Sequence, residues 1–146
     1  MTAITQHIVE WIQYLSKPQE NIGGISVCPF AKNAKYKVVE VDRELIVLPD
    51  SETDLVICVL PNDISKDELA NRCKTLNDTY QDYIFLPDHK DRKTFINGVR
   101  TNNDMYNLIL CQSKEKLLKA REVLMKTEYY SYWSKEYLKE ITGIEL

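Results

Sequence analysis

Six consecutive apolar residues, Leu55 to Leu60, constrain the fold of this chain more than any other feature of its sequence. A run that is apolar on both faces is typical of a central strand that is covered on each side. Pro61-Asn62-Asp63 closes the run, and Ser65-Lys66-Asp67-Glu68 has the pattern of a capping box, which starts a helix. The sequence therefore predicts a buried strand followed directly by a helix. The apolar face of that helix holds Leu69, Cys73 and Leu76.

Hydrophobic periodicity predicts the remaining elements. Apolar residues at helical spacing between Ile4 and Leu15 predict a first helix, which Lys17-Pro18 ends because the residue before a proline avoids the α conformation. The β-prone run Leu45–Leu48 is either a short strand or a continuation of the strand before it. Further strands are expected over 36–42, 83–86 (stopped by Pro87) and 107–111, and helices from Ser113 onward and over 129–141.

This order of elements predicts a single domain over residues 1–146 with an α+β fold. We expect a two-layer sandwich in a ferredoxin-like arrangement, with helices packed on a mixed sheet of about four to five strands. Short connections favour antiparallel neighbours, whereas the capped helix between two strands favours one crossover. The alternative is a three-layer α/β sheet, which the doubly apolar strand suggests.

Composition excludes several classes of function. The net charge of −3 is spread along the chain, which argues against nucleic-acid binding. The apolar runs are too short to cross a membrane and the N-terminus lacks a signal pattern, so we expect a cytoplasmic protein without a membrane partner. The four cysteines show no metal-ligand spacing, and no cofactor or metal is predicted. The richness in Lys, Asn, Ile and Tyr is typical of an AT-rich viral or bacterial genome.

Cys28 is the first half of a candidate site. Two glycines, Gly23 and Gly24, lead toward it, and Pro29 follows it directly, which is typical of the first turn of a helix. A short helical turn from Cys28 to about Asn33 would place the thiol at the positive end of a helix dipole, with Lys32 one turn along. Cys28 is therefore a candidate nucleophile. The alternative is that its sulfur only packs into the core.

The second half is the polar segment 87–104, which shows no convincing period and is unusually long for a connection. We expect it to cover a site for a small-molecule or anionic ligand next to Cys28. Candidate acid–base groups are Asp88 and His89, and candidate ligand-binding groups are Lys32, Arg100, Asn102, Asn103 and Tyr106. His89 with Asp88 and Asp91 is too thin a ligand set for a metal. Whether the protein is an enzyme stays open.

The C-terminal aromatic residues support an alternative of another class. Tyr130, Trp133, Tyr137 and Ile141 fall on one face of the expected final helix. That face either packs on the body of the protein or binds a partner, because Tyr and Trp are enriched at interfaces. The alternative function is therefore non-catalytic protein binding or assembly into a homo-oligomer.

Two families share the Cys-Pro-Phe run. Monothiol thioredoxin-like proteins need a strand directly before the cysteine, whereas a helix and a glycine loop precede it here. The order of features resembles instead the uncharacterised bacterial family called domain of unknown function 1415. The residues that carry this resemblance are Trp11, Cys28-Pro29-Phe30-Ala31, Pro87-Asp88, Thr101-Asn102, Tyr106, Leu108 to Leu110 and Ser113. In the family a histidine precedes the Pro-Asp pair, whereas His89 follows it. The resemblance implies a relationship and no particular activity.

Overall fold

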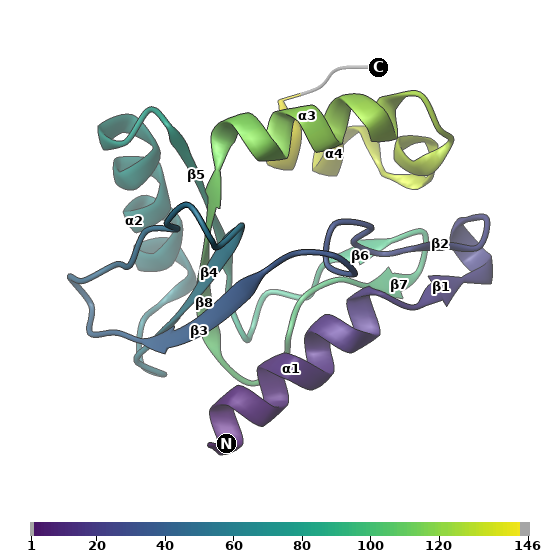
Figure 1. Cartoon of the computed structure of the whole chain (residues 1–146). Helices are drawn as coiled ribbons and strands as arrows, with labels where there is room; N and C mark the ends of the chain where they lie inside the picture. The colour runs from purple at the N-terminus through teal and green to yellow at the C-terminus, as the bar shows by residue number, and fades with distance from the viewer. Residues whose placement is uncertain (1, 144–146) are drawn as a thin grey trace.

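A mixed sheet of four strands forms the centre of the molecule (Figure 1). The computed structural model describes residues 2–143. The strand order is β3 (Tyr36–Glu40), β4 (Leu55–Leu60), β8 (Asn107–Ser113) and β5 (Tyr83–Asp88). β3 runs parallel to β4, and β8 runs antiparallel to both β4 and β5. The expected α+β sandwich with a mixed sheet is confirmed.

β4 is covered on both faces, as its apolar run predicts. Helix α2 (Lys66–Thr79) covers one face, where Leu69 and Cys73 pack with Val56 and Cys58. Ser65 caps this helix, since its hydroxyl accepts a hydrogen bond from the Glu68 amide at 3.0 Å. Helix α1 (Ala3–Leu15) covers the opposite face and packs on the alternate residues of β4. The residues of that second cluster include Ile8, Trp11, Ile12, Ile57, Val59 and Leu108.

The connection between β3 and β4 corrects one expectation. These sequential strands are parallel rather than antiparallel, with Val38 opposite Ile57. Parallel neighbours need a crossover, and residues 41–54 supply it. Within this connection the run Leu45–Leu48 forms no strand, and its Ile46, Val47 and Leu48 pack on the α2 side of the sheet instead.

The segment 87–104 is more ordered than its sequence suggests. β5 does not stop at Pro87 but continues to Asp88, with Pro87 opposite Ile109. Edge strands tolerate proline, and β5 is an edge strand of this sheet. The segment then forms a small hairpin of β6 (Phe95–Ile96) and β7 (Val99–Arg100). Asn97 and Gly98 form its turn with positive φ angles of 46° and 84°.

The C-terminal elements lie on the same side of the sheet as α1 (Figure 1). After α1, the chain forms β1 (Pro18–Gln19), the 3-10 turn η1 (Glu20–Ile22) and β2 (Ile25–Ser26). After β8 come helix α3 (Lys114–Met125), the 3-10 turn η2 (Tyr129–Tyr132) and helix α4 (Lys135–Thr142). The expected final helix over 129–141 is therefore broken, because Ser134 caps a separate helix by accepting a hydrogen bond from Tyr137 at 3.2 Å. Every helix within residues 2–143 is too short or too polar to cross a membrane.

Candidate functional site

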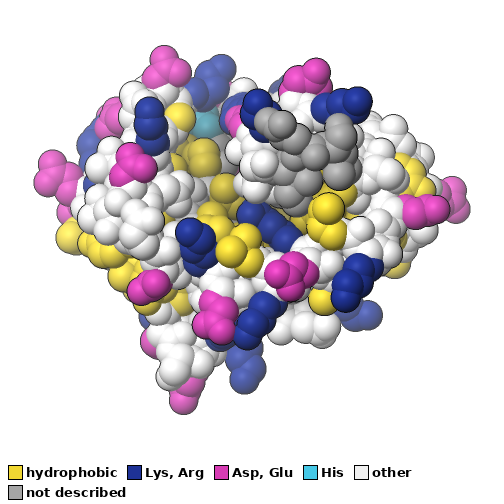
Figure 2. All heavy atoms as spheres, turned by 90° about the horizontal axis from the view of Figure 1, so that it is seen from above, with side chains coloured by type: hydrophobic (Ala, Val, Ile, Leu, Met, Phe, Trp, Pro, Cys, Tyr) yellow, Lys and Arg dark blue, Asp and Glu magenta, His cyan; other side chains and the backbone are white. Residues whose placement is uncertain are grey.

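A cavity of about 550 Å³ lies between the sheet and the C-terminal helices. Its walls come from the Cys28 turn, the 87–104 segment, the sheet strands and helices α1, α3 and α4. Both halves of the candidate site, Cys28 and the 87–104 segment, therefore line one space. On the face formed by α3 and α4, hydrophobic side chains gather in the middle with Lys and Arg side chains among them (Figure 2).

Cys28 does not begin a helix, which corrects the sequence-based expectation. Residues 27–33 form bends and turns, in which the Cys28 carbonyl accepts a hydrogen bond from the Ala31 amide at 3.1 Å. The Cys28 amide itself donates to the Leu15 carbonyl at 3.0 Å, so its conformation is set by the end of α1. Burial raises the pKa of the Cys28 thiol, and the amides of Ala31 and Phe30 only partly offset this. The arrangement provides a thiol that contacts the cavity without being activated as a thiolate.

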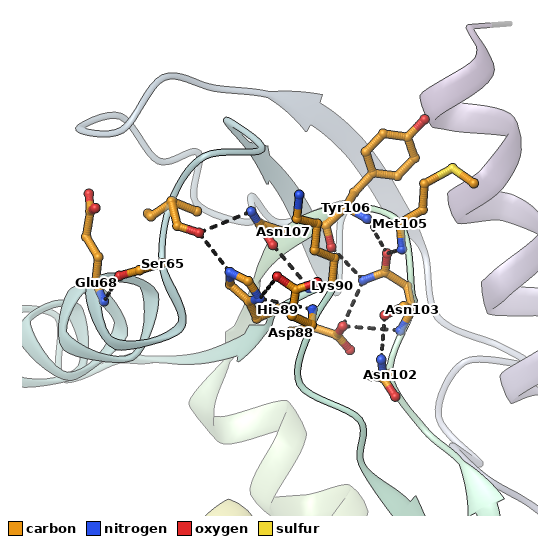
Figure 3. Close-up of polar contacts among 12 residues, drawn as sticks. Ser65, Glu68, Asp88, His89, Lys90, Asn102, Asn103, Met105, Tyr106 and Asn107 are labelled. Atoms are coloured by element: carbon orange, nitrogen blue, oxygen red, sulfur yellow. Dashed lines mark hydrogen bonds and ion pairs between the residues drawn. The ribbon is translucent and has the colours of Figure 1, made fainter.

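Asp88 is the titratable group best placed for acid–base chemistry. It ends β5 and lines the cavity. Its Oδ1 accepts hydrogen bonds from the backbone amide of Asn103 at 3.2 Å and from the side-chain amide of the same residue at 2.8 Å (Figure 3). Burial raises the pKa of Asp88 to about 7, although the Asn103 hydrogen bonds and the Arg100 charge act in the opposite direction. A carboxyl group with such a pKa exchanges a proton readily near neutral pH.

His89 also lines the cavity, but both of its ring nitrogens are engaged. Nε2 lies 2.7 Å from the Ile64 carbonyl, and Nδ1 lies 3.1 Å from the Asp91 amide (Figure 3). A carbonyl accepts and an amide donates, so Nε2 acts as the donor and Nδ1 as the acceptor in these contacts. His89 therefore joins β5 to the segment that leads into α2. Among residues 2–143, no group of His, Cys, Asp and Glu side chains is placed to hold a metal ion.

The other sequence-predicted residues divide into one that lines the cavity and several that do not. Asn102 lines it, and its Oδ1 accepts a hydrogen bond from the Thr94 amide at 3.1 Å. Asn103 lies outside the cavity lining and contacts Asp88. Its Oδ1 accepts hydrogen bonds from the amides of Met105 and Tyr106. The residues that lie outside the cavity lining are Lys32, Arg100, Asn103 and Tyr106.

A chain of hydroxyl groups lines the cavity on the Asp88 side. The Thr94 and Thr101 hydroxyls are hydrogen-bonded to each other, and Thr101 Oγ1 lies 3.4 Å from Tyr137 Oη. All three residues line the cavity. Burial raises the pKa of Tyr137, and the nearby Asp88 carboxylate raises it further. These groups offer hydrogen-bond donors and acceptors beside a largely apolar space.

The C-terminal residues of the cavity wall were not predicted from the sequence. Tyr129, Tyr130 and Trp133 line it as an aromatic cluster, in which the rings of Tyr130 and Trp133 lie 5.3 Å apart between centroids. The Tyr129 hydroxyl donates a hydrogen bond to the Val27 carbonyl, which joins η2 to the Cys28 turn. Arg121 of α3 also lines the cavity and is only 8% exposed. Burial lowers its pKa, and the Tyr130 hydroxyl partly offsets this.

Arg121 carried a signal that could have been found in the sequence. It lies four residues after Leu117 and three before Leu124, the two other buried residues of α3. Residues at these spacings share one face of a helix, so the pattern places a charged side chain on the buried face.

Comparisons with known proteins give this chain no relative. No protein-family model, no curated protein and no solved structure matches it. The resemblance to the Cys-Pro-Phe-Ala family therefore stays a prediction, and the function rests on the cavity alone.

Proposed function

We propose that this protein binds a small, largely apolar molecule in the cavity between the Cys28 turn and the 87–104 segment. The observation that carries the proposal is the cavity itself, whose volume of about 550 Å³ is in the range of small-molecule sites. Its walls combine aliphatic and aromatic side chains with a few polar groups, which is the usual composition of such a site.

Asp88 is the residue that we propose for any proton transfer in the cavity. Its pKa of about 7 lets it donate or accept a proton near neutral pH. The two other candidate catalytic residues are less suited. The Cys28 thiol has a raised pKa, and the His89 ring uses both nitrogens to hold the backbone. Cys28 is therefore proposed as a wall residue that contacts the ligand.

The alternative of partner binding through the aromatic C-terminal segment has less support. Tyr129 and Tyr130 are buried against the same chain, in a cluster with Leu124, Leu138 and Phe30. Trp133 packs on this cluster as well. These aromatic side chains pack within the chain and form the cavity wall, so the aromatic content of the C-terminal segment is explained without a partner.

A neutral fluorescent probe tests the proposed binding. N-phenyl-1-naphthylamine becomes bright in apolar sites, and both tryptophans of the chain, Trp11 and Trp133, line the cavity and can transfer excitation energy to it. Ala120→Phe adds a ring to the cavity wall from α3, whereas Ala70→Phe adds the same ring on the exposed face of α2. We expect saturable binding by the wild type and Ala70→Phe, and binding at least about fivefold weaker in Ala120→Phe, a loss of about 1 kcal/mol.

The two variants give the experiment its contradicting outcomes. Equal affinity in Ala120→Phe and Ala70→Phe would place the probe outside the cavity. If neither the probe nor a panel of neutral aromatic compounds bound to the wild type, the proposed function would be wrong. Circular dichroism of both variants checks that the added ring leaves the fold intact.

A further inference from the structure

Arg121 is a buried cation without an ionised partner among residues 2–143. Its side chain points from the inner face of α3, and the residue is 8% exposed. Its Nη2 donates a hydrogen bond to the Ile141 carbonyl at 3.4 Å, and the Tyr130 hydroxyl interacts with the guanidinium. A guanidinium has five N–H donors and stays protonated in proteins, and these two contacts are both to neutral groups.

The other charges of the cavity wall are balanced. Lys116 Nζ lies 2.9 Å from Asp54 Oδ1, and Arg92 forms an ion pair with Glu140. Asp88 lies near the positive charge of Arg100, a residue outside the cavity lining. Within the described part of the chain, Arg121 is thus the charged residue of this wall that has no carboxylate beside it.

An unpaired buried charge is costly, because the protein gives up its hydration without a compensating ion. Such a group is stabilised when a ligand supplies the opposite charge. The planar fork of an arginine fits a carboxylate with two parallel hydrogen bonds. A single unbalanced cation suits a ligand with one negative charge better than a phosphate dianion, for which several cations are usual.

We propose that the ligand of this cavity is an organic carboxylate with an aromatic or aliphatic body, and that Arg121 binds its carboxylate group. This inference rests on the proposed function, since it concerns the same cavity. Tyr130 interacts with Arg121, the Trp133 ring lies 5.3 Å from the Tyr130 ring between centroids, and both rings line the cavity and would contact the apolar body. The hydroxyls of Thr94 and Thr101 line the cavity from the 87–104 segment and would contact a further polar group of the ligand.

A matched set of compounds tests the charge preference. The compounds 4-phenylbutyrate, 4-phenyl-1-butanol, 4-phenylbutylamine and 4-phenylbutyl phosphate share one body and differ in the head group. Isothermal titration calorimetry with the wild type should show the carboxylate binding at least about tenfold more tightly than the alcohol, the difference expected for one charged hydrogen-bonded contact. The amine should bind most weakly, and the phosphate no more tightly than the carboxylate.

Substitution of Arg121 tests the residue. In Arg121→Gln the ratio of carboxylate to alcohol affinity should fall to about one, while the alcohol itself still binds; Arg121→Lys should keep part of the preference because it keeps the charge. Lys119→Gln removes an exposed cation from the same helix and should keep the wild-type ratio. An unchanged ratio in a folded Arg121→Gln would overturn the assignment to Arg121.

The outcomes separate this inference from the proposed function. If the alcohol binds the wild type as tightly as the carboxylate, or the amine or phosphate binds best, the carboxylate inference is wrong and the cavity remains a binding site. If none of the four compounds binds, and the neutral probe also fails, the proposed function is wrong with it. The relative affinities of the four compounds for the wild type test the carboxylate inference even if Arg121→Gln does not fold.

Discussion

Asn103 donates two hydrogen bonds to one oxygen of Asp88, from its backbone amide at 3.2 Å and from its side-chain amide at 2.8 Å. Both bonds favour the ionised carboxylate, yet burial outweighs them and raises the pKa of Asp88 to about 7. The carboxyl group is thus oriented by Asn103, and its raised pKa lies near neutral pH. This relationship gives the cavity a group that can titrate.

Asp88 should make the protein less stable as the pH rises. Its pKa is about 7 in the folded state against an ordinary value of 3.8, so the folded protein binds this proton more tightly than the unfolded chain does. The free energy of unfolding should therefore fall between pH 4 and pH 7 and be constant above, with about 2–4 kcal/mol arising from this one group. Urea denaturation of the wild type and of Asp88→Asn across this pH range measures the difference.

The comparison isolates Asp88 because Asn cannot titrate and still offers an oxygen to Asn103. The variant should gain stability relative to the wild type as the pH rises. Asp78→Asn changes an exposed carboxylate on α2 and should follow the wild type throughout. A constant difference between Asp88→Asn and the wild type from pH 4 to pH 8 would show that the carboxyl has an ordinary pKa.

Asn103 should be needed for the conformation of residues 103–106. Its side-chain oxygen accepts hydrogen bonds from the amides of Met105 and Tyr106, and its Nδ2 donates to the Tyr106 carbonyl at 2.9 Å. Asn103→Ala leaves these partly buried backbone groups without their side-chain partner, so we expect it to lower the free energy of unfolding by about 1–2 kcal/mol. Asn62→Ala, at an exposed turn position, should change it by less than about 0.5 kcal/mol. Chemical denaturation that found the two variants equally stable would contradict this role.

The fold could be predicted largely because its signals are local. The run Leu55–Leu60 is apolar on both faces and is covered on both faces, and Ser65 caps α2 as expected, although the Glu68 carboxylate pairs with Arg43 instead of completing the capping box. What the sequence did not reveal depends on distant partners. The parallel pairing of β3 with β4 depends on how residues 41–54 cross the sheet, and the β6–β7 hairpin was missed because its strands are too short to show alternation.

The sequence predicted which segments form the candidate site, but not the protonation and burial of the side chains in it. The segments that carry Cys28 and Asp88 could be chosen by their local composition, and the structure places both in the wall of one cavity. The state of the Cys28 thiol could not be predicted, because its turn is fixed by Leu15 rather than by a helix of its own. Arg121 was overlooked because a charged residue in a helix is usually on the solvent face, although its spacing from Leu117 and Leu124 places it on the buried face of α3.

Tyr129 should stabilise the contact between the C-terminal segment and the Cys28 turn. Its hydroxyl donates a hydrogen bond to the Val27 carbonyl, and the residue is buried. Tyr129→Phe keeps the ring and leaves that carbonyl unpaired, so we expect the free energy of unfolding to fall by about 1–2 kcal/mol. Tyr80→Phe removes a hydroxyl from a partly exposed ring and serves as the matched control, with little change expected. If thermal melts of the two variants coincide, the hydroxyl does not contribute to stability.

Cys28 should react slowly with alkylating reagents at neutral pH. It is the one cysteine that is not fully buried, so iodoacetamide should label it first, as mass spectrometry of peptides can verify. Only the thiolate reacts, and burial raises the pKa of this thiol. We therefore expect a rate below that of glutathione at pH 7, and a rate that still rises beyond pH 9. Cys28→Ser should abolish the early labelling. A rate above that of glutathione at pH 7, with a plateau below pH 8, would instead identify an activated thiolate and restore Cys28 as a candidate nucleophile.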